Sequence, residues 1–325
     1  MLSEVKRISN LKLAAIVVWY YPQRIDNIVQ KTLSYASTVK VYIIDNTPFD
    51  NSGLAIQVPG ADYIPLLKNT GIAAAQNIGC ERASKDGFEW VMTMDQDSYF
   101  EIGQFESYLQ KVNQFSITDE KAVSYSVSIR DDSKQVLPLT TLIKNKLKSF
   151  LLEHHYISKT PATTTSMPAI DHPDRVFASA NIISLSAWKE VGKFDEALFI
   201  DEVDFDFCIR LRMSGYYITR FNTLHLNHKL GNRKFTIFPK TTHHSGKRLY
   251  YIIRNKLIEN RRYRYALVLH RDYIKEIHRY FKDYCILSWR APQNWVIFGK
   301  AFFAYKTFMK GDRTFLELKE KGLAK

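Results

Sequence analysis

The feature that most constrains the fold of this chain is a regular alternation of apolar and amphipathic segments over its first 130 residues. Residues 13–20 read LAAIVVWY, an almost continuous apolar run that is typical of a strand covered on both faces. The same patterns predict further strands at 39–44, 63–67 and 90–94 and helices at 25–35 and 72–84. Strands that alternate with helices through short connections predict a mostly parallel sheet with helices on both faces, an α/β fold.

Polar residues follow several of these predicted strands. Asp45 ends the second strand, Asn69 follows the third, and residues 95–98 (Asp-Gln-Asp-Ser) continue directly from the fourth. In open α/β sheets, ligands bind beyond the carboxyl ends of the strands. We therefore expect these residues to face one crevice.

Asp95 and Asp97 flank a single residue at the end of a buried strand. Side chains two positions apart on a strand point the same way, and two carboxylates so close repel each other unless a cation lies between them. Mg²⁺ or Mn²⁺ is the natural neutraliser, because hard divalent ions prefer oxygen ligands and also bridge diphosphate oxygens. The alternative is a solvated turn with acidic caps, and the strand context favours the metal site.

A second acidic cluster, Asp201-Glu202-Val203-Asp204-Phe205-Asp206, places four acids within six residues. Neighbouring carboxylates raise one another's pKa, so the cluster is the best candidate for a general base. An acidic helix start, stabilised by the helix macrodipole, explains the same pattern structurally. Further on, a neutral imidazole of His225, His228, His243 or His244 is a candidate to complete the metal site. Arg248, Arg254 and the nearby Lys256 are candidates to hold a diphosphate.

The basic charge of the chain is concentrated in its C-terminal third. The formal net charge is +13, and residues 229–325 hold 23 Lys and Arg against 7 Asp and Glu. Three widely spaced cysteines and no signal-sequence pattern predict a reducing compartment. No apolar run approaches the roughly 20 residues of a spanning helix, so we do not expect an integral membrane protein.

Together these residues resemble family 2 of the inverting glycosyltransferases, which have the glycosyltransferase-A fold, and within it the bacterial rhamnosyltransferases. The resemblance covers about residues 12–262 and rests on motifs in a fixed order. They are IIDN (43–46), NTGIAAAQNIG (69–79), MDQDS (94–98), SANII (179–183), FIDEVD (199–204), HKLG (228–231) and RLYY (248–251) followed by Arg254-Asn255.

The resemblance implies a role for each matching residue on the donor side. Asp45 contacts the nucleobase, while Asn69, Gly71 and the helix they precede, with Asn77, line the nucleotide pocket. Asp95 holds the ribose and supports the metal, Asp97 ligates the metal directly, and His228 is the second protein ligand.

For the acceptor side, the resemblance places the catalytic base at Asp204. Many family members have Glu-Asp where this chain has Val203-Asp204, so Asp201 is kept as a second candidate. The rhamnosyltransferase branch usually has Ser-Gly-Asn where this chain has Ser179-Ala180-Asn181, and we expect that difference to adjust the fit of the acceptor.

The leading prediction is transfer of L-rhamnose from dTDP-L-rhamnose to a polysaccharide or lipid-linked glycan of the cell envelope. The same chemistry with a UDP-hexose or UDP-galactofuranose donor is the alternative, and a catalytically dead scaffold is disfavoured by the retained Asp95, Asp97 and Asp204. A protein that binds nucleic acid through its basic third is a third alternative. No nucleic-acid motif is present, so we expect no such partner. The expected division is a catalytic domain over 1–245, with halves 1–130 and 131–245, and a helical region over 246–325.

The C-terminal region alternates basic and aromatic residues between 263 and 310. On helices, this composition suits a boundary with an anionic membrane, and it equally suits packing onto the catalytic domain or a second subunit. We expect the membrane, and hence a cytoplasmic protein peripheral to the inner face of the plasma membrane. A homo-oligomer is the competing expectation.

Overall fold

The computed structural model describes residues 11–131, 168–228, 245–264, 273–282, 285 and 291–321. Their elements in the N-terminal part are β1 (Leu13–Trp19), η1 (Pro22–Arg24), α2 (Ile28–Ala36), β2 (Lys40–Asp45), α3 (Ser52–Ala55), β3 (Asp62–Pro65), α4 (Ile72–Lys85), β4 (Trp90–Asp95), β5 (Ser98–Tyr99), α5 (Gln104–Thr118) and β6 (Ala122–Asp131). The later elements are β7 (Ile170–Asp171), β8 (Asn181–Ser184), α7 (Leu185–Glu190), η2 (Glu196–Leu198), α8 (Val203–Met213), β9 (Tyr217–His228), α9 (Gly246–Tyr263), α10 (Tyr273–Phe281), α11 (Ala291–Met309) and α12 (Arg313–Glu320).

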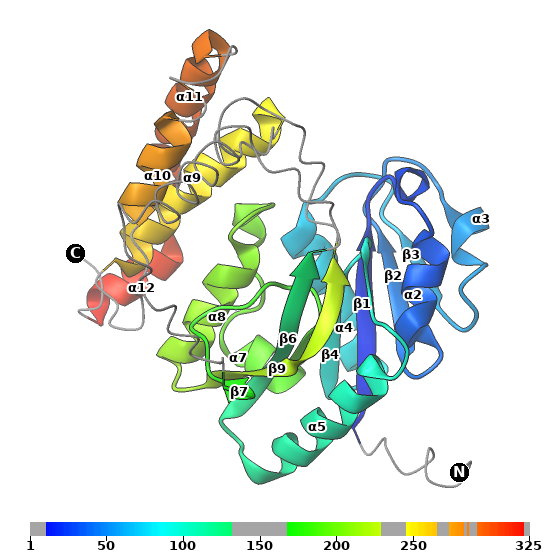
Figure 1. The fold of residues 1–325 in the computed structure, drawn as a ribbon. Coiled ribbons are helices and arrows are strands. Elements are labelled where there is room, and N and C mark those ends of the chain that lie inside the picture. The colour runs from blue at the N-terminus through cyan, green and yellow to red at the C-terminus, as the bar shows by residue number, and fades with distance from the viewer. Residues whose placement is uncertain are drawn as a thin grey trace, which may run out of the picture.

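The described strands form one sheet in the order β3-β2-β1-β4-β8-β6-β9-β5, with β7 on β9 (Figure 1). The first four strands in this order are parallel, as predicted, and so are β6 and β9. Strand β8 runs antiparallel between β4 and β6. The carboxyl ends of β2, β4, β6 and β9 therefore meet at one edge of the sheet, and this edge carries the functional site.

Strand β1 separates two cores because its residues alternate between the faces of the sheet. Leu13, Ala15, Val17 and Trp19 pack with α2 and α5, whereas Ala14, Ile16 and Val18 pack with α4, α7 and α8. A Cβ atom on Gly79 of α4 would lie 2.5 Å from Ile16, so the glycine allows this helix to pack closely against the strand.

One element differs informatively from its predicted bounds. The helix expected over 25–35 begins at Ile28, after the short η1 turn. Later in the chain, strand β8 begins only at Asn181, because Ala180 has a φ of 59° and the Asn181 amide donates back to the Ala178 carbonyl.

The C-terminal helices attach to the α8 side of the sheet (Figure 1). Ile258 of α9 belongs to the same core as α8, and Leu249 and Ile253 of α9 pack with Ala301 of α11. None of the described helices combines the length and apolarity that crossing a membrane requires.

Candidate active site

Asp95, Asp97 and His228 come together at the carboxyl edge of the sheet. Asp95 ends β4, Asp97 follows in the turn to β5, and His228 ends β9, which pairs with β5. One ligand atom from each residue lies within 4.8 Å of the other two. The His228 Nδ1 atom is 3.7 Å from a carboxylate oxygen of each aspartate. The three residues predicted to hold the metal therefore form one group.

The electrostatics of this group favour a bound cation. Burial raises the pKa of the Asp95 carboxyl, and the charge of Asp97 raises it further, against the opposing effects of His228 and Arg248. Two carboxylates and an imidazole are a donor set that suits Mg²⁺ or Mn²⁺. A divalent ion would relieve the repulsion between the two aspartates, so the residues present fit the metal predicted from the sequence.

Gln96 and Ser179, two motif residues to which no individual role was assigned from the sequence, hold this turn in place. The Gln96 amide accepts a hydrogen bond from the Tyr20 backbone N–H at 2.8 Å and donates to the Tyr20 carbonyl at 3.0 Å. The Ser179 hydroxyl donates to Ser98 Oγ at 2.9 Å and accepts from the Asp95 backbone N–H at 3.3 Å. These contacts join the metal group to β1 and to the turn before β8.

On the nucleotide side, Asp45 is fully buried at the end of β2. Its carboxylate accepts hydrogen bonds from Asn51 Nδ2 and the Tyr63 hydroxyl, both at 2.7 Å, and from the Thr47 amide at 3.1 Å. The predicted contact of Asp45 with a base therefore has to compete with three protein donors.

Asn69 and Gly71 shape the turn before α4. Asn69 Oδ1 accepts from the Gly71 amide at 3.0 Å and from Asn46 Nδ2 at 3.2 Å. Gly71 has a φ of 88°, and a Cβ atom there would lie 2.6 Å from the Phe199 ring. The Ile72 amide donates to the Phe199 carbonyl at 2.7 Å. This glycine thus joins the nucleotide side to the acidic cluster.

Asp204 lies in the first turn of α8, where Asp204 Oδ2 accepts from the Ala178 amide at 3.1 Å. Burial, followed by the charge of Glu202, raises the pKa of Asp204 to about 7. Asp95 adds to this effect, while the Ala178 amide opposes it. A carboxylate with a pKa near neutrality is well suited to accept a proton at physiological pH.

Asp201, the second candidate for the base, is paired with Arg248. Arg248 Nη2 is 2.9 Å from Asp201 Oδ1, and half of the arginine side chain is exposed. The ion pair holds Arg248 near Asp95, since the pKa of Arg248 responds to the charge of that residue. The arrangement leaves Asp204 as the better base and Arg248 as a candidate phosphate ligand.

Two other predicted donor-site residues have protein partners throughout. Asn77 Nδ2 donates to the Phe194 carbonyl and to Glu196, and Asn77 Oδ1 accepts from Trp188 Nε1 and the Phe194 amide. Arg254 donates to the Ala197 and Leu198 carbonyls at 2.6 and 3.0 Å. These bonds show that both residues support the fold, and their contact with the nucleotide stays a prediction.

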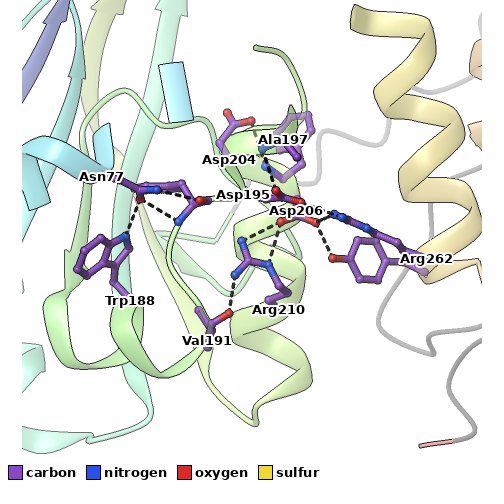
Figure 2. Close-up of polar contacts among 12 residues, drawn as sticks. Asn77, Trp188, Val191, Asp195, Ala197, Asp204, Asp206, Arg210 and Arg262 are labelled. Atoms are coloured by element: carbon purple, nitrogen blue, oxygen red, sulfur yellow. Dashed lines mark hydrogen bonds and ion pairs between the residues drawn. The ribbon is translucent and has the colours of Figure 1, made fainter. Parts of the chain in front are cut away.

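Asp206, two residues after Asp204, belongs to a buried ion network that the sequence did not reveal. Figure 2 shows its carboxylate between the guanidinium groups of Arg210 and Arg262. Arg262 of α9 also donates to Asp195 and to both carboxylate oxygens of Asp312. Burial alone would raise the pKa of Asp206, but the two arginines hold it below its usual range. Asp206 therefore fastens α8 to α9 and is not available as a base.

Comparison with known proteins identifies the class to which this site belongs. Residues 16–166 match the family described as Glycosyl transferase family 2. The chain therefore carries a family 2 glycosyltransferase domain, and the protein is a sugar transferase with a glycosyltransferase-A fold.

A curated relative agrees with this class, and a solved structure has a similar fold. The chain is 26% identical over 262 residues to "dTDP-rhamnosyl transferase RfbF" of Shigella flexneri, covering 80% of this chain and 83% of that protein. Residues 1–349 of S. aureus TarS in complex with UDP-GlcNAc align with a TM-score of 0.51 and 12% identity, over 91% of this chain and 80% of that one. A longer TarS structure aligns with a TM-score of 0.49, and this chain spans 47% of its length.

Proposed function

We propose that the protein transfers L-rhamnose from dTDP-L-rhamnose to a hydroxyl group of a polysaccharide or lipid-linked glycan, with inversion at the anomeric carbon. The observation that carries this proposal is the Asp95–Asp97–His228 group at the carboxyl edge of the sheet, together with a carboxylate, Asp204, whose pKa of about 7 is raised in part by the charge of Asp95. The similarity to a dTDP-rhamnosyl transferase supports the choice of donor.

We propose that Asp95, Asp97 and His228 hold Mg²⁺ or Mn²⁺, which when bound stabilises the negative charge of the departing diphosphate. Arg248 adds a cation on the same side of the crevice, and it can donate two parallel hydrogen bonds to phosphate oxygens. Asp45, Asn69 and Gly71 form the end of the crevice that receives the nucleoside.

On the acceptor side, Asp204 takes the proton of the acceptor hydroxyl. The hydroxyl oxygen forms its bond to the anomeric carbon as the bond from that carbon to the phosphate oxygen breaks. Attack in line with the leaving group inverts the configuration, and the nucleoside diphosphate departs with the bonding electrons. The proton remains on Asp204 until it passes to solvent.

A thermal-shift comparison of nucleotides tests the donor. We expect dTDP with Mn²⁺ to raise the melting temperature more than UDP with Mn²⁺, and an oligonucleotide to have no effect. Stronger stabilisation by UDP would instead indicate that the donor is a UDP-hexose or UDP-galactofuranose. Stabilisation by the oligonucleotide alone would contradict a sugar-nucleotide site altogether.

The base assignment has its own test. Asp204→Asn should preserve the effect of dTDP on melting but lower turnover by 10² to 10⁴, the usual contribution of a general base. Asp201→Asn should have a smaller effect on turnover. It should lower the affinity for the donor, since it frees Arg248 from its ion pair with Asp201. The reverse order of the two effects on turnover would assign the base to Asp201.

We also propose that the protein is cytoplasmic and binds the inner face of the plasma membrane through α11. One face of this helix exposes Trp295, Val296, Phe302 and Phe303, with the exposed fractions of Trp295 and Phe303 at 53% and 74%. Lys300 and Lys306 are exposed on the same helix. Aromatic side chains beside cations suit the headgroup region of an anionic bilayer.

Sedimentation with lipid vesicles tests this surface. We expect binding to vesicles that contain phosphatidylglycerol, release as salt rises, and a loss of binding in Phe303→Ser. The equivalent change at Phe49→Ser, an exposed aromatic residue in the loop after β2, should leave vesicle binding unchanged. Binding that does not respond to lipid charge, together with a dimer that Phe303→Ser dissociates, would show that the face pairs subunits.

We retain the division into a catalytic domain over 1–245 and a helical region over 246–325 as a proposal. Proteolysis of the native protein should leave the two parts associated, because buried ion pairs of Arg262 and Lys256 cross this boundary. Separation of a folded fragment ending near 245 under native conditions would show that the two parts are independent.

A further inference from the structure

A cavity of about 520 Å³ lies beside Asp204, and none of the residues proposed to bind the donor lines it. Its walls are Ser126–Ile129 of β6 and residues 174–177, and Phe205 and Arg220 close it. The walls are continuous with the base: Phe205 follows Asp204 in α8, and Phe177 precedes Ala178, whose amide binds the Asp204 carboxylate at 3.1 Å. A molecule in this acceptor-side cavity would therefore be next to Asp204.

The aromatic side of this cavity is preformed. The rings of Phe177 and Phe205 lie 5.6 Å apart, and Phe177 is 53% exposed. Such rings provide an apolar face on which a sugar can rest, while the hydroxyl groups of Ser126 and Ser128 line the strand opposite. A carbohydrate has both kinds of surface.

The charge of the cavity comes from Arg175. Its guanidinium lies 5.0 Å from the centre of the Phe205 ring, and Nη1 is buried without a hydrogen-bond partner among the described residues. The other charged groups of the cavity are neutralised, because Asp174 pairs with Arg212 at 3.2 Å and Arg220 donates to Asp171 at 3.0 Å. A buried donor without a partner is costly, so this atom marks a place for an acceptor group from a ligand.

We propose that this cavity binds the acceptor, and that the acceptor presents a sugar ring with an anionic substituent, a phosphate or a carboxylate. Arg175 binds the anion, Phe177 supports the ring, and the hydroxyl to be glycosylated is directed to Asp204. The inference rests on the proposed function in taking Asp204 as the base, and it does not depend on the identity of the donor.

Calorimetry on the full chain with three small probes tests the assignment. Glucose 1-phosphate, glucuronic acid and methyl glucoside differ in their charge, and each is titrated in the presence of Mn²⁺ and dTDP. We expect both acids to bind at least tenfold more tightly than methyl glucoside. The tighter of the two acids identifies the anion as phosphate or carboxylate.

Variants separate the two contacts. Arg175→Gln should reduce the affinity of both acids to that of methyl glucoside, and Arg175→Lys should retain part of the difference. Phe177→Ala should lower the affinity for all three probes by the same factor. Because Phe177 is exposed, this variant should fold even if Arg175→Gln does not. Arg82→Gln, which removes a surface arginine on α4, is the matched control and should change nothing.

Equal affinity for all three probes overturns the assignment, and so do acids that bind Arg175→Gln as tightly as they bind the unaltered chain. Binding of glucose 1-phosphate that disappears in Asp97→Ala also overturns it, since the probe would then occupy the donor site. If the acids bind through Arg175 but dTDP gives no stabilisation, the cavity assignment holds and the proposed donor is wrong.

Discussion

The replacement Asp204→Asn should remove activity and at the same time stabilise the protein above neutral pH. The Asp204 carboxyl has a pKa of about 7 in the folded chain, against an ordinary value of 3.8. Between these two values the folded state binds a proton that the unfolded state does not bind. Stability therefore falls as pH rises from about 4 to about 7, because the folded protein must accept a buried negative charge.

The size of the effect follows from the two pKa values. The difference between about 7 and 3.8 corresponds to about 4 kcal/mol of folding free energy, fully expressed above pH 7. An asparagine has no charge to bury, and its carbonyl oxygen can still accept from the Ala178 amide. The free energy of unfolding of the variant should thus exceed that of the unaltered chain by up to about 4 kcal/mol at pH 8, and the two should be equal near pH 4.

Thermal or urea unfolding at pH 4.5, 6 and 8 measures this difference. The buffer must contain a chelator, since a divalent cation near Asp95 would stabilise the Asp204 carboxylate and lower its pKa. Leu33→Asn, which alters an exposed residue of α2, controls for a general effect of the amide and should show no pH-dependent gain. A stability difference that is the same at all three pH values would refute the raised pKa and, with it, the physical basis for choosing Asp204 as the base.

Three further predictions concern the metal, the close approach at Gly71 and the ion network. Asp97→Ala should abolish the Mn²⁺-dependent part of dTDP binding in calorimetry, and unchanged binding in EDTA would remove the metal from the mechanism. Gly71→Ala should cost more than 2 kcal/mol in urea unfolding because its Cβ would meet Phe199, whereas Gly87→Ala, at a similar φ in open space, should cost about 1 kcal/mol. Arg262→Ala should destabilise the protein by about 3–5 kcal/mol in the same assay, since it leaves the buried Asp312 carboxylate without its arginine and removes one of the two arginines that bind Asp206. A loss below 1 kcal/mol would contradict the network.

The first half of the fold was predictable because its signals are local. A buried parallel strand has a continuous apolar sequence, and a ligand-binding residue at its end follows at once, as Asp95 follows Met94. The metal group was predictable for the same reason, except that His228 required the resemblance to a family. The structure also explains why the rhamnosyltransferase branch usually has glycine at the position of Ala180. The residue there has a φ of 59°, which glycine adopts easily. This chain accepts the left-handed conformation without a glycine.

The structural roles that sequence reasoning did not reveal depend on partners far along the chain. Asn77 is bonded to residues 188, 194 and 196, and Arg254 to residues 197 and 198. Nothing within one helical turn of either residue indicates these contacts. Arg262 was not selected for the same reason, because its partners Asp195, Asp206 and Asp312 lie on three separate elements. A basic helix with aromatic residues gives the same composition whether it faces lipid or binds a protein core.

Helix α9 supports the segment that leads to Asp204, the proposed base. Phe199, Asp201 and Glu202 all have positive φ values, a conformation that costs free energy for residues other than glycine. The Asn255 amide is within hydrogen-bonding distance of the Leu198, Ile200 and Asp201 carbonyls, at 2.8–2.9 Å. Lys256 binds the Glu202 carboxylate in the next position of the same helix. Helix α9 of the C-terminal region therefore stabilises the strained turn before Asp204, so replacing Asn255 should disturb the proposed base although the two residues lie on either side of position 245.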